Sequence, residues 1–287
     1  MSVRHLVDVQ QQDENIGADA PQKPSSNDTS KFLRAWAWKR EHRPDKIRFH
    51  RPYIHSMTSP AVKLTLQQSK FDAEGFASTI WDSSIVMSKY FERWGSRWAG
   101  KKCLDLSAGC GLVGIVLTRL GADVVLTDLL PNLPLLADNC KANVPQDASG
   151  SVIIKEHRWG ERLADLGGPF DVIVACDVMY IEAAIPDLVK TLVAAASPFT
   201  DIYISHGRNR QAEHVFQTCC KGKLLVSQVD SSQLDEVYQT GDVDVLHLQS
   251  NSSDALAGGS SYRQHTCRVP SKQTTQKFVT YEPAVRS

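Results

Sequence analysis

From residue 101 to residue 249 the chain alternates short apolar runs with longer segments that have helical spacing. This alternation predicts an α/β domain built on a largely parallel sheet. The last two apolar runs have no helix-length segment between them, so this pair is expected to be antiparallel. The expected strands are 101–107, 123–129, 151–159, 170–178, 201–207, 223–230 and 242–249.

Helical spacing is clearest over 82–94, where Val86, Tyr90 and Trp94 recur four residues apart. Asp82 or Ser83 is expected to cap the start of that helix. A helix near 133–144 would have Pro134 in its first turn. Further helices are expected from residue 112, over 185–196 and over 209–220.

The chain outside this pattern divides into three parts. Residues 1–30 are polar and are expected to be a disordered tail. Residues 31–75 form a basic and aromatic extension with an early strand around 62–66, where apolar and polar residues alternate. The domain that carries the alternating pattern is expected to span 76–250, and 251–287 is expected to be a flexible tail.

Charge and cysteine content narrow the class of protein. Lys plus Arg and Asp plus Glu both number 32, so no global charge attracts nucleic acid. The seven cysteines show neither CxxC pairs nor zinc-site spacing, and no metal site is expected. Because the sequence shows no signal-peptide core or membrane-length apolar run, we expect an intracellular protein. The cytoplasm is the expected location, with the nucleus as a second compartment.

The stretch LDLSAGCGLVG, residues 104–114, places Gly109, Gly111 and Gly114 where a strand turns into a helix. Such a loop lets a ligand approach the backbone, although the same glycines could instead serve close helix–strand packing. An acid, Asp128, follows the next strand 19 positions after Gly109 (128 − 109) and could take two ribose hydroxyls.

The acid at the end of the first strand separates two candidate ligands. A dinucleotide carries an anionic pyrophosphate, which Asp105 would repel. S-adenosylmethionine has no phosphate and carries an ammonium and a sulfonium, which a carboxylate attracts. The loop therefore favours a methyl donor.

Four segments, in order, resemble the class I, seven-stranded methyltransferases, and within them the family-16 protein-lysine methyltransferases. GFASTIWDSSIVMSKYFE contains the family's Trp-Asp pair, and LDLSAGCGLVGIVLTRLGADVVLTDL contains its donor loop and ribose acid. HRWGE contains the tryptophan that lies against adenine, and DVIVACDVMY contains an Asp-x-x-Tyr signature. The resemblance covers roughly residues 60–250.

The resemblance implies a doubly wound, Rossmann-like seven-stranded sheet, with an antiparallel pair at its C-terminal end and an N-terminal extension. It implies S-adenosyl-L-methionine as cofactor and catalytic roles for Asp177 and Tyr180, which would orient the acceptor amine and line a lysine channel. The residues expected to bind the cofactor are Trp81, Asp105, Ser107, Gly109, Gly111, Asp128, Trp159 and Cys176.

The loop differs from the family's Glu-Leu-Gly-Ala-Gly-Thr-Gly pattern at three positions, and two of these differences bear on charge and turn geometry. Asp105 replaces the glutamate, keeping its charge with one methylene fewer, and Ser107 replaces a glycine, which predicts a slightly different turn. The acceptor would be a lysine of a protein substrate, by resemblance a chaperone or a translation factor. We expect a monomer that binds neither membrane nor nucleic acid.

Other interpretations remain at this stage. Asp177 could be a helix N-cap, Tyr180 and Trp159 could be core residues, and Trp81 could pack ahead of its helix. The basic segment 31–55 could dock an acidic partner or nucleic acid, or its rings could pack on the domain while its charges stay solvated.

Three other functions compete with lysine methylation. The first is methylation of RNA or of a small molecule, which the absence of proline in DVMY disfavours. The second is a cofactor-binding module without catalysis, which intact Asp177 and Tyr180 disfavour. The third is a nucleotide-dependent oxidoreductase, which Asp105 disfavours.

Overall fold

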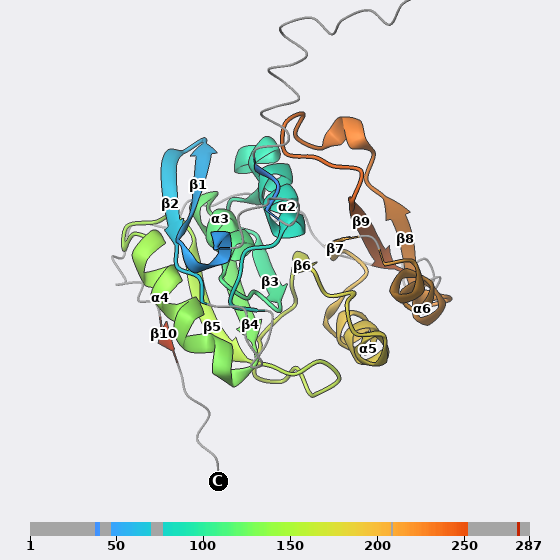
Figure 1. Cartoon of the computed structure of the whole chain (residues 1–287). Helices are drawn as coiled ribbons and strands as arrows, with labels where there is room; N and C mark the ends of the chain where they lie inside the picture. The colour runs from blue at the N-terminus through green and yellow to red at the C-terminus, as the bar shows by residue number, and fades with distance from the viewer. Residues whose placement is uncertain (1–37, 41–46, 70–76, 208, 252–279, 282–287) are drawn as a thin grey trace, which may run out of the picture.

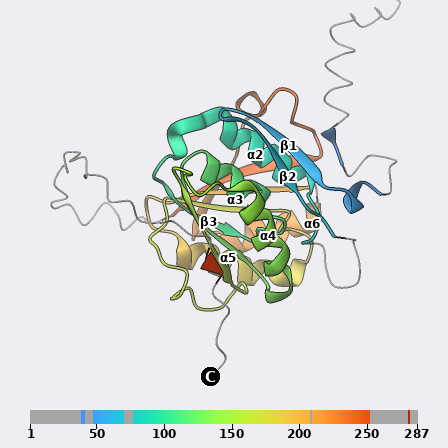
Figure 2. The same ribbon diagram turned by 90° about the vertical axis from the view of Figure 1, so that its left-hand side faces the viewer.

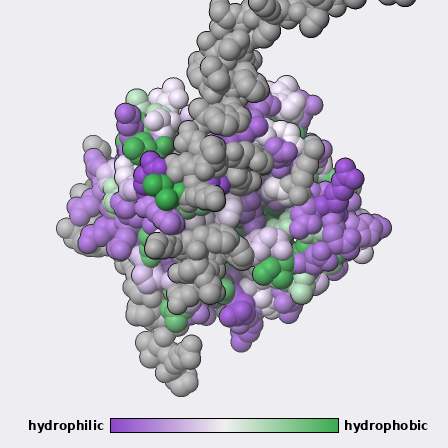
Figure 3. Space-filling model, viewed as in Figure 1, coloured by the Kyte–Doolittle hydropathy of each residue, from purple (hydrophilic) through white to green (hydrophobic). Residues whose placement is uncertain are grey.

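The computed structural model describes residues 38–40, 47–69, 77–207, 209–251 and 280–281 (Figure 1). The predicted disordered tail, most of the C-terminal tail and part of the basic segment lie outside these residues. None of the described helices is long and apolar enough to cross a membrane. The face seen in Figure 3 is mainly hydrophilic, with small separate hydrophobic patches.

The predicted sheet is present, and its strands run in the order β10-β5-β4-β3-β6-β7-β9-β8. Strands β5, β4, β3, β6 and β7 are parallel, and β9 is antiparallel to both β7 and β8, as the short link between them predicts. The strands are β3 (Lys102–Leu106), β4 (Asp123–Asp128), β5 (Ser151–Glu156), β6 (Val172–Cys176), β7 (Asp201–Gly207), β8 (Leu224–Gln228) and β9 (Val243–Ser250).

An eighth strand adds to the seven expected. β10 (Thr280–Tyr281) pairs in parallel with Ile153 and Ile154 of β5, at the outer edge of the sheet. These two residues belong to the segment expected to be a flexible tail, so at this point the chain returns to the domain.

Helices cover both faces of the sheet (Figure 1). One core cluster packs the helices α2 (Asp82–Trp94), α3 (Leu112–Arg119) and α4 (Leu133–Asn143) on one face. A second cluster packs α5 (Ile185–Ala195) and α6 (Arg210–Cys220) on the other. Alternate residues of β6 belong to alternate clusters, and because both faces are covered the strand is apolar throughout.

The start of α2 differs from the prediction. Trp81 is the N-cap residue, with extended backbone and no side-chain capping hydrogen bond, and Asp82 is the first helical residue. One Asp82 oxygen accepts a hydrogen bond from the Arg40 amide at 2.6 Å. The expected cap at Asp82 or Ser83 is therefore wrong, because both side chains have partners outside the helix.

The early strand predicted around 62–66 is β2 (Ala61–Leu66), and it pairs with a strand that was not predicted, β1 (Tyr53–Thr58). Figure 2 shows this hairpin beside α4. Asn143 of α4 accepts from the Thr65 amide and donates to the Thr65 carbonyl, at 2.8 and 2.9 Å. These side-chain bonds replace the strand partner that the edge of β2 lacks.

The described part of the basic segment packs on the domain. The Trp38 indole donates to the Val237 carbonyl at 2.6 Å, and its ring lies 5.6 Å from that of Tyr238. The Phe49 ring lies 5.6 Å from that of Trp81. These contacts favour the packed interpretation of the segment over the nucleic-acid one.

Candidate active site

A cavity of about 1020 Å³ opens at the carboxyl ends of β3, β4, β6 and β7, where ligands of doubly wound sheets bind. It collects side chains from segments more than a hundred residues apart. The predicted site residues that line it are Trp81, Asp105, Ser107, Gly109, Asp128, Trp159, Cys176, Asp177 and Tyr180.

The three glycines of the loop have different roles. Gly109 lines the cavity with φ +57°, and a Cβ there would lie 2.8 Å from the Ala77 carbonyl oxygen. Gly111 does not line the cavity, and its Cβ would lie 2.6 Å from Leu136. At Gly114 a Cβ would lie 2.0 Å from Leu126. Thus the packing interpretation holds for Gly111 and Gly114, and Gly109 is the one of the three that borders the cavity.

Ser107 has φ +69°, the left-handed conformation that glycine adopts without cost. Ser107 therefore has a backbone conformation that favours glycine, and the slightly different turn expected at this position stays a prediction. Forcing a side chain into this region costs about 1–2 kcal/mol. Such strain often lies at functional sites.

Asp128 ends β4 and organises the glycine loop. One carboxylate oxygen accepts from the Gly109 amide at 2.8 Å, and the other accepts from the Leu129 amide and the Asn132 side chain at 2.8 and 2.6 Å. Burial raises the pKa of Asp128, and these donors oppose the rise. The carboxylate is thus fixed at the cavity wall, in the position expected of an acid that accepts from ribose hydroxyls.

Asp105 lies near the end of β3, one position before the last residue of the strand, Leu106. It is 2% exposed, and its Oδ2 atom has no hydrogen-bond partner among the described residues. Burial, together with the charge of Asp128, raises the pKa of Asp105 to about 8. A cation in the cavity would favour the ionised form, so this residue fits a sulfonium or ammonium ligand.

Two tryptophans contribute half-buried indole rings to the cavity. Trp81 precedes α2, and Trp159 lies in the turn after β5 and also packs against the second core cluster. Neither is simply a core residue, because both border the cavity.

Asp177 follows the last residue of β6, Cys176, and has φ +55°. Its amide donates to the Ser205 carbonyl at 2.8 Å, and its Oδ2 accepts from the Ser83 hydroxyl. The next short helix begins at Glu182 with Ile181 as its cap, so Asp177 is not a helix N-cap. Cys176 also lines the cavity, and burial raises the pKa of its thiol well above the usual range.

Tyr180 borders the cavity and is 54% exposed. The alternative that it packs in the core is therefore wrong. Its neighbour Ile181 is 50% exposed and also lines the cavity, as does Met179. Tyr180 and Ile181 are thus a half-exposed part of the cavity lining, and Met179 is a buried part of it.

Sequence reasoning missed several lining residues, including Asn132 and His157. Asn132 lies between the end of β4 and the start of α4, and a polar side chain just beyond the carboxyl end of a strand could have indicated it. His157 carries no comparable signal. His206, Gly207 and Asn209 also line the cavity, at the end of β7 and just after it, and Arg208 lies outside the described residues.

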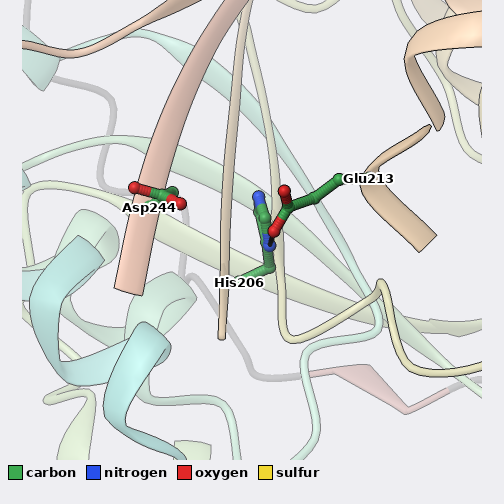
Figure 4. Close-up of side chains that lie close together, drawn as sticks. All are labelled: His206, Glu213 and Asp244. Atoms are coloured by element: carbon green, nitrogen blue, oxygen red, sulfur yellow. Dashed lines mark ion pairs between the residues drawn. The ribbon is translucent and has the colours of Figure 1, made fainter. Parts of the chain in front are cut away.

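His206, Glu213 and Asp244 lie together on β7, α6 and β9 (Figure 4). Their candidate metal-ligating atoms lie within 4.8 Å of one another. The Asn209 amide donates to Glu213 at 3.1 Å and the Gln228 amide group donates to Asp244 at 2.8 Å. Because these bonds account for the carboxylate positions, we assign no metal to the cluster.

Comparisons with known proteins agree with this geometry. A family model described as lysine methyltransferase matches residues 58–223. Protein N-lysine methyltransferase METTL21A of Danio rerio is 35% identical over 169 residues, which cover 58% of this chain and 77% of the relative. The METTL21A of Mus musculus is 33% identical over 193 residues, covering 67% and 87%.

EEF1A lysine methyltransferase 3 of Mus musculus is 33% identical over 156 residues, covering 54% of this chain and 66% of the relative. Among solved structures, a SAM-dependent methyltransferase from Agrobacterium tumefaciens superposes with a TM-score of 0.48 at 13% identity, covering 73% of each chain.

Proposed function

The chain belongs to the lysine methyltransferase family, and from this premise we propose how its cavity serves the reaction. The protein is an S-adenosylmethionine-dependent methyltransferase that acts on the ε-amine of a lysine in a protein substrate. The observation that carries our assignment of roles is the single cavity in which nine separately predicted residues meet.

On the donor side, we assign cofactor binding to the residues around the glycine loop. Asp128 would accept from the ribose hydroxyls, and the buried carboxyl of Asp105 would face the cationic part of the molecule. Trp81 and Trp159 offer flat apolar surfaces to the adenine. The orphaned Asp105 oxygen and the absence of a side chain at Gly109 are the features that fit this ligand.

When bound, S-adenosylmethionine supplies a methyl group on a positively charged sulfur. The acceptor lysine must lose its proton before its nitrogen can attack. With a pKa of about 10.4, deprotonation at pH 7 costs roughly 4–5 kcal/mol, at 1.36 kcal/mol per unit. An apolar channel lowers that cost because burial disfavours the ammonium form. Alignment of the amine then supplies most of the remaining advantage.

On the acceptor side, we assign these two tasks to Asp177 and Tyr180. The carboxylate of Asp177 is held rigidly at the cavity wall and can accept a hydrogen bond from the amine, which orients its lone pair. Tyr180 and Ile181 are half exposed and apolar on their faces, so they can enclose the four methylenes of the lysine side chain.

For the target we propose a translation factor, because one relative is named for the methylation of EEF1A. A chaperone is the second candidate. We further propose a monomer that needs no nucleic acid and works in the cytoplasm and, as a second compartment, the nucleus. The six described cysteines are free thiols, which is compatible with a reducing compartment.

Two experiments test this assignment. Calorimetric titration with S-adenosylmethionine, S-adenosylhomocysteine and NADH should show binding of the first two only. Incubation with tritium-labelled donor and either purified EEF1A or cell-extract protein should give label that protease releases and nuclease does not. Label released by nuclease would overturn the protein substrate.

The Asp177→Ala variant tests the catalytic assignment. It should lose transfer while its affinity for the donor stays within a few-fold of the wild type, since Asp177 is assigned to the acceptor. Wild-type turnover in this variant would remove Asp177 from the mechanism.

A further inference from the structure

Asp177 needs support to hold its position. A residue with a side chain rarely adopts φ +55°, so the surrounding contacts must maintain this backbone conformation. Its amide is held by the Ser205 carbonyl at 2.8 Å, which fixes the backbone and leaves the side chain to be oriented by another group.

Ser83 is such a group, because its hydroxyl donates to Oδ2 of Asp177 across a separation of 94 residues. Ser83 is completely buried in the first turn of α2, which packs across β6 and β7. A buried hydroxyl with one partner and no access to water holds that partner in place, since breaking the bond leaves both groups unsatisfied.

The other serines of α2 behave differently. The Ser84 hydroxyl donates to the Trp81 carbonyl at 2.8 Å and the Ser88 hydroxyl donates to the Ser84 carbonyl at 2.7 Å. Bonding back to the preceding turn is the usual habit of serine inside a helix. The Ser83 hydroxyl instead donates to Asp177, just after the end of β6. Its hydrogen bond therefore holds the segment that carries Asp177 and does not stabilise the helix itself.

The turn that carries Ser83 is itself anchored on two sides. The Ser205 hydroxyl donates to the Ser83 carbonyl at 3.0 Å, and the Arg40 amide donates to the adjacent Asp82 at 2.6 Å. Ser205 therefore contacts both Ser83 and Asp177, and the three residues form a closed set of hydrogen bonds. The set is linked through Arg40 to the basic N-terminal segment.

We propose that Ser83 is the positioning residue for Asp177: its hydroxyl fixes the carboxylate in the single orientation that aligns the acceptor lysine. This inference rests on the proposed catalytic role of Asp177. Ser83 itself does not line the cavity and would touch neither donor nor lysine.

The test is a double-mutant cycle on the full-length protein, with tritium-labelled donor at saturation and cell-extract protein as acceptor. Ser83→Ala should lower the rate of transfer roughly 10- to 100-fold, because a misaligned group loses about that much. The dissociation constant of the donor should stay within about twofold of the wild type, since effects on separate sites are independent. In the Asp177→Ala background the same change should have no further effect, because the partner it acts through is gone.

Two further variants separate positioning from folding. Ser88→Ala removes a hydroxyl from the same helix that bonds only within it, and should leave transfer unchanged. Ser83→Thr keeps the hydroxyl and should recover most of the rate lost in Ser83→Ala. Melting temperatures of all variants would identify any that fold poorly.

The outcomes distinguish this proposal from the function on which it rests. Wild-type transfer by Ser83→Ala, or an equal loss in both backgrounds, would overturn the positioning role and leave the catalytic assignment intact. Wild-type transfer by Asp177→Ala would overturn both.

Discussion

The two halves of the cavity differ in how firmly they are held. On the donor side, Asp128 accepts three hydrogen bonds from neighbouring donors, and Asp105 is 2% exposed. On the acceptor side, Tyr180 and Ile181 are about half exposed. The donor is the same small molecule in every turnover, so its site can be rigid. The acceptor is part of a protein surface, so its site must remain open.

The largest effect should follow the loss of Asp128. Asp128→Ala removes the ribose acceptor and also releases Gly109 and Asn132, so donor affinity should fall roughly 10²- to 10³-fold, as for two hydrogen bonds to a charged group. Calorimetric titration measures this fall. Asp123→Ala, at the opposite end of the same strand, is the matched control and should bind the donor normally. Equal losses in both variants would mean that general destabilisation had been measured.

Asp105 predicts a pH effect confined to the donor side. With its pKa raised to about 8 in the absence of a cation, it must release a proton when the cationic donor binds. Affinity should therefore rise with pH from about 6 to 7.5, by up to roughly tenfold per unit. Titration in two buffers of different ionisation enthalpy would detect the released proton. Asp105→Asn should bind about 10- to 100-fold more weakly with no pH dependence, as for one charged hydrogen bond.

The raised pKa of Asp105 also makes the stability of the donor-free protein depend on pH, and this stability should fall as the pH rises. Because the folded state holds a proton on Asp105 that the unfolded chain releases above about pH 4, this residue destabilises the fold increasingly between about pH 4 and 8. Asp105→Asn should therefore melt a few degrees higher than the wild type at pH 7.5 without donor. A lower melting temperature would show that the carboxyl is stabilised by contacts other than the cationic ligand.

The glycines allow packing and binding to be separated. Gly114→Ala places a methyl group 2.0 Å from Leu126 and should cost about 1–3 kcal/mol of stability, measured by urea denaturation. In Gly109→Ala the added methyl group meets a backbone carbonyl at the cavity. For the same loss of stability, this variant should therefore lose more donor affinity than Gly114→Ala. If the two variants lose donor affinity in parallel with stability, the loop has no binding role of its own.

Tyr180 should give a smaller effect, limited to the acceptor side. Tyr180→Ala removes part of the lysine channel and should raise the KM for the protein substrate roughly five- to tenfold, about 1 kcal/mol, as for a partly exposed apolar contact. Tyr180→Phe keeps the ring and should remain near wild type. Donor affinity should be unchanged in both variants. A change in donor affinity would show that Tyr180 does not act on the acceptor side alone.

The smallest change is expected at Ser107. Ser107→Gly relieves the strain at φ +69° but adds flexibility to the unfolded chain, so the net gain in stability should be below about 1 kcal/mol. Thermal melting would measure it. A loss of stability would show that the serine side chain contributes a contact that outweighs its strain.

The sequence predicted the elements that depend on local patterns. Strand and helix periodicity recovered seven of the eight strands of the sheet, all but β10, and 82–94 coincides with α2, because its apolar face is marked by residues four apart. Asp105, Gly109 and Asp128 could be placed because a loop after a strand brings them to one edge of the sheet. The donor side therefore follows from residues close together in the chain.

The acceptor side required the fold. The partner of Asp177 is Ser83, 94 residues away, and nothing in the spacing of these residues relates them. The cap of α2 was misassigned for the same reason, since Asp82 bonds to Arg40 on another segment. Contacts between segments far apart in the chain have no period, so residue patterns do not predict them.

The short strand β10 has a practical consequence. Thr280 and Tyr281 occupy the outer edge of β5, beside Ile153, whose side chain is 39% exposed. A protein truncated before Thr280 would leave the amide and carbonyl groups of that edge without a partner. An unpaired apolar edge is a template on which other chains can add, so the shortened enzyme should be more prone to form aggregates than the intact one.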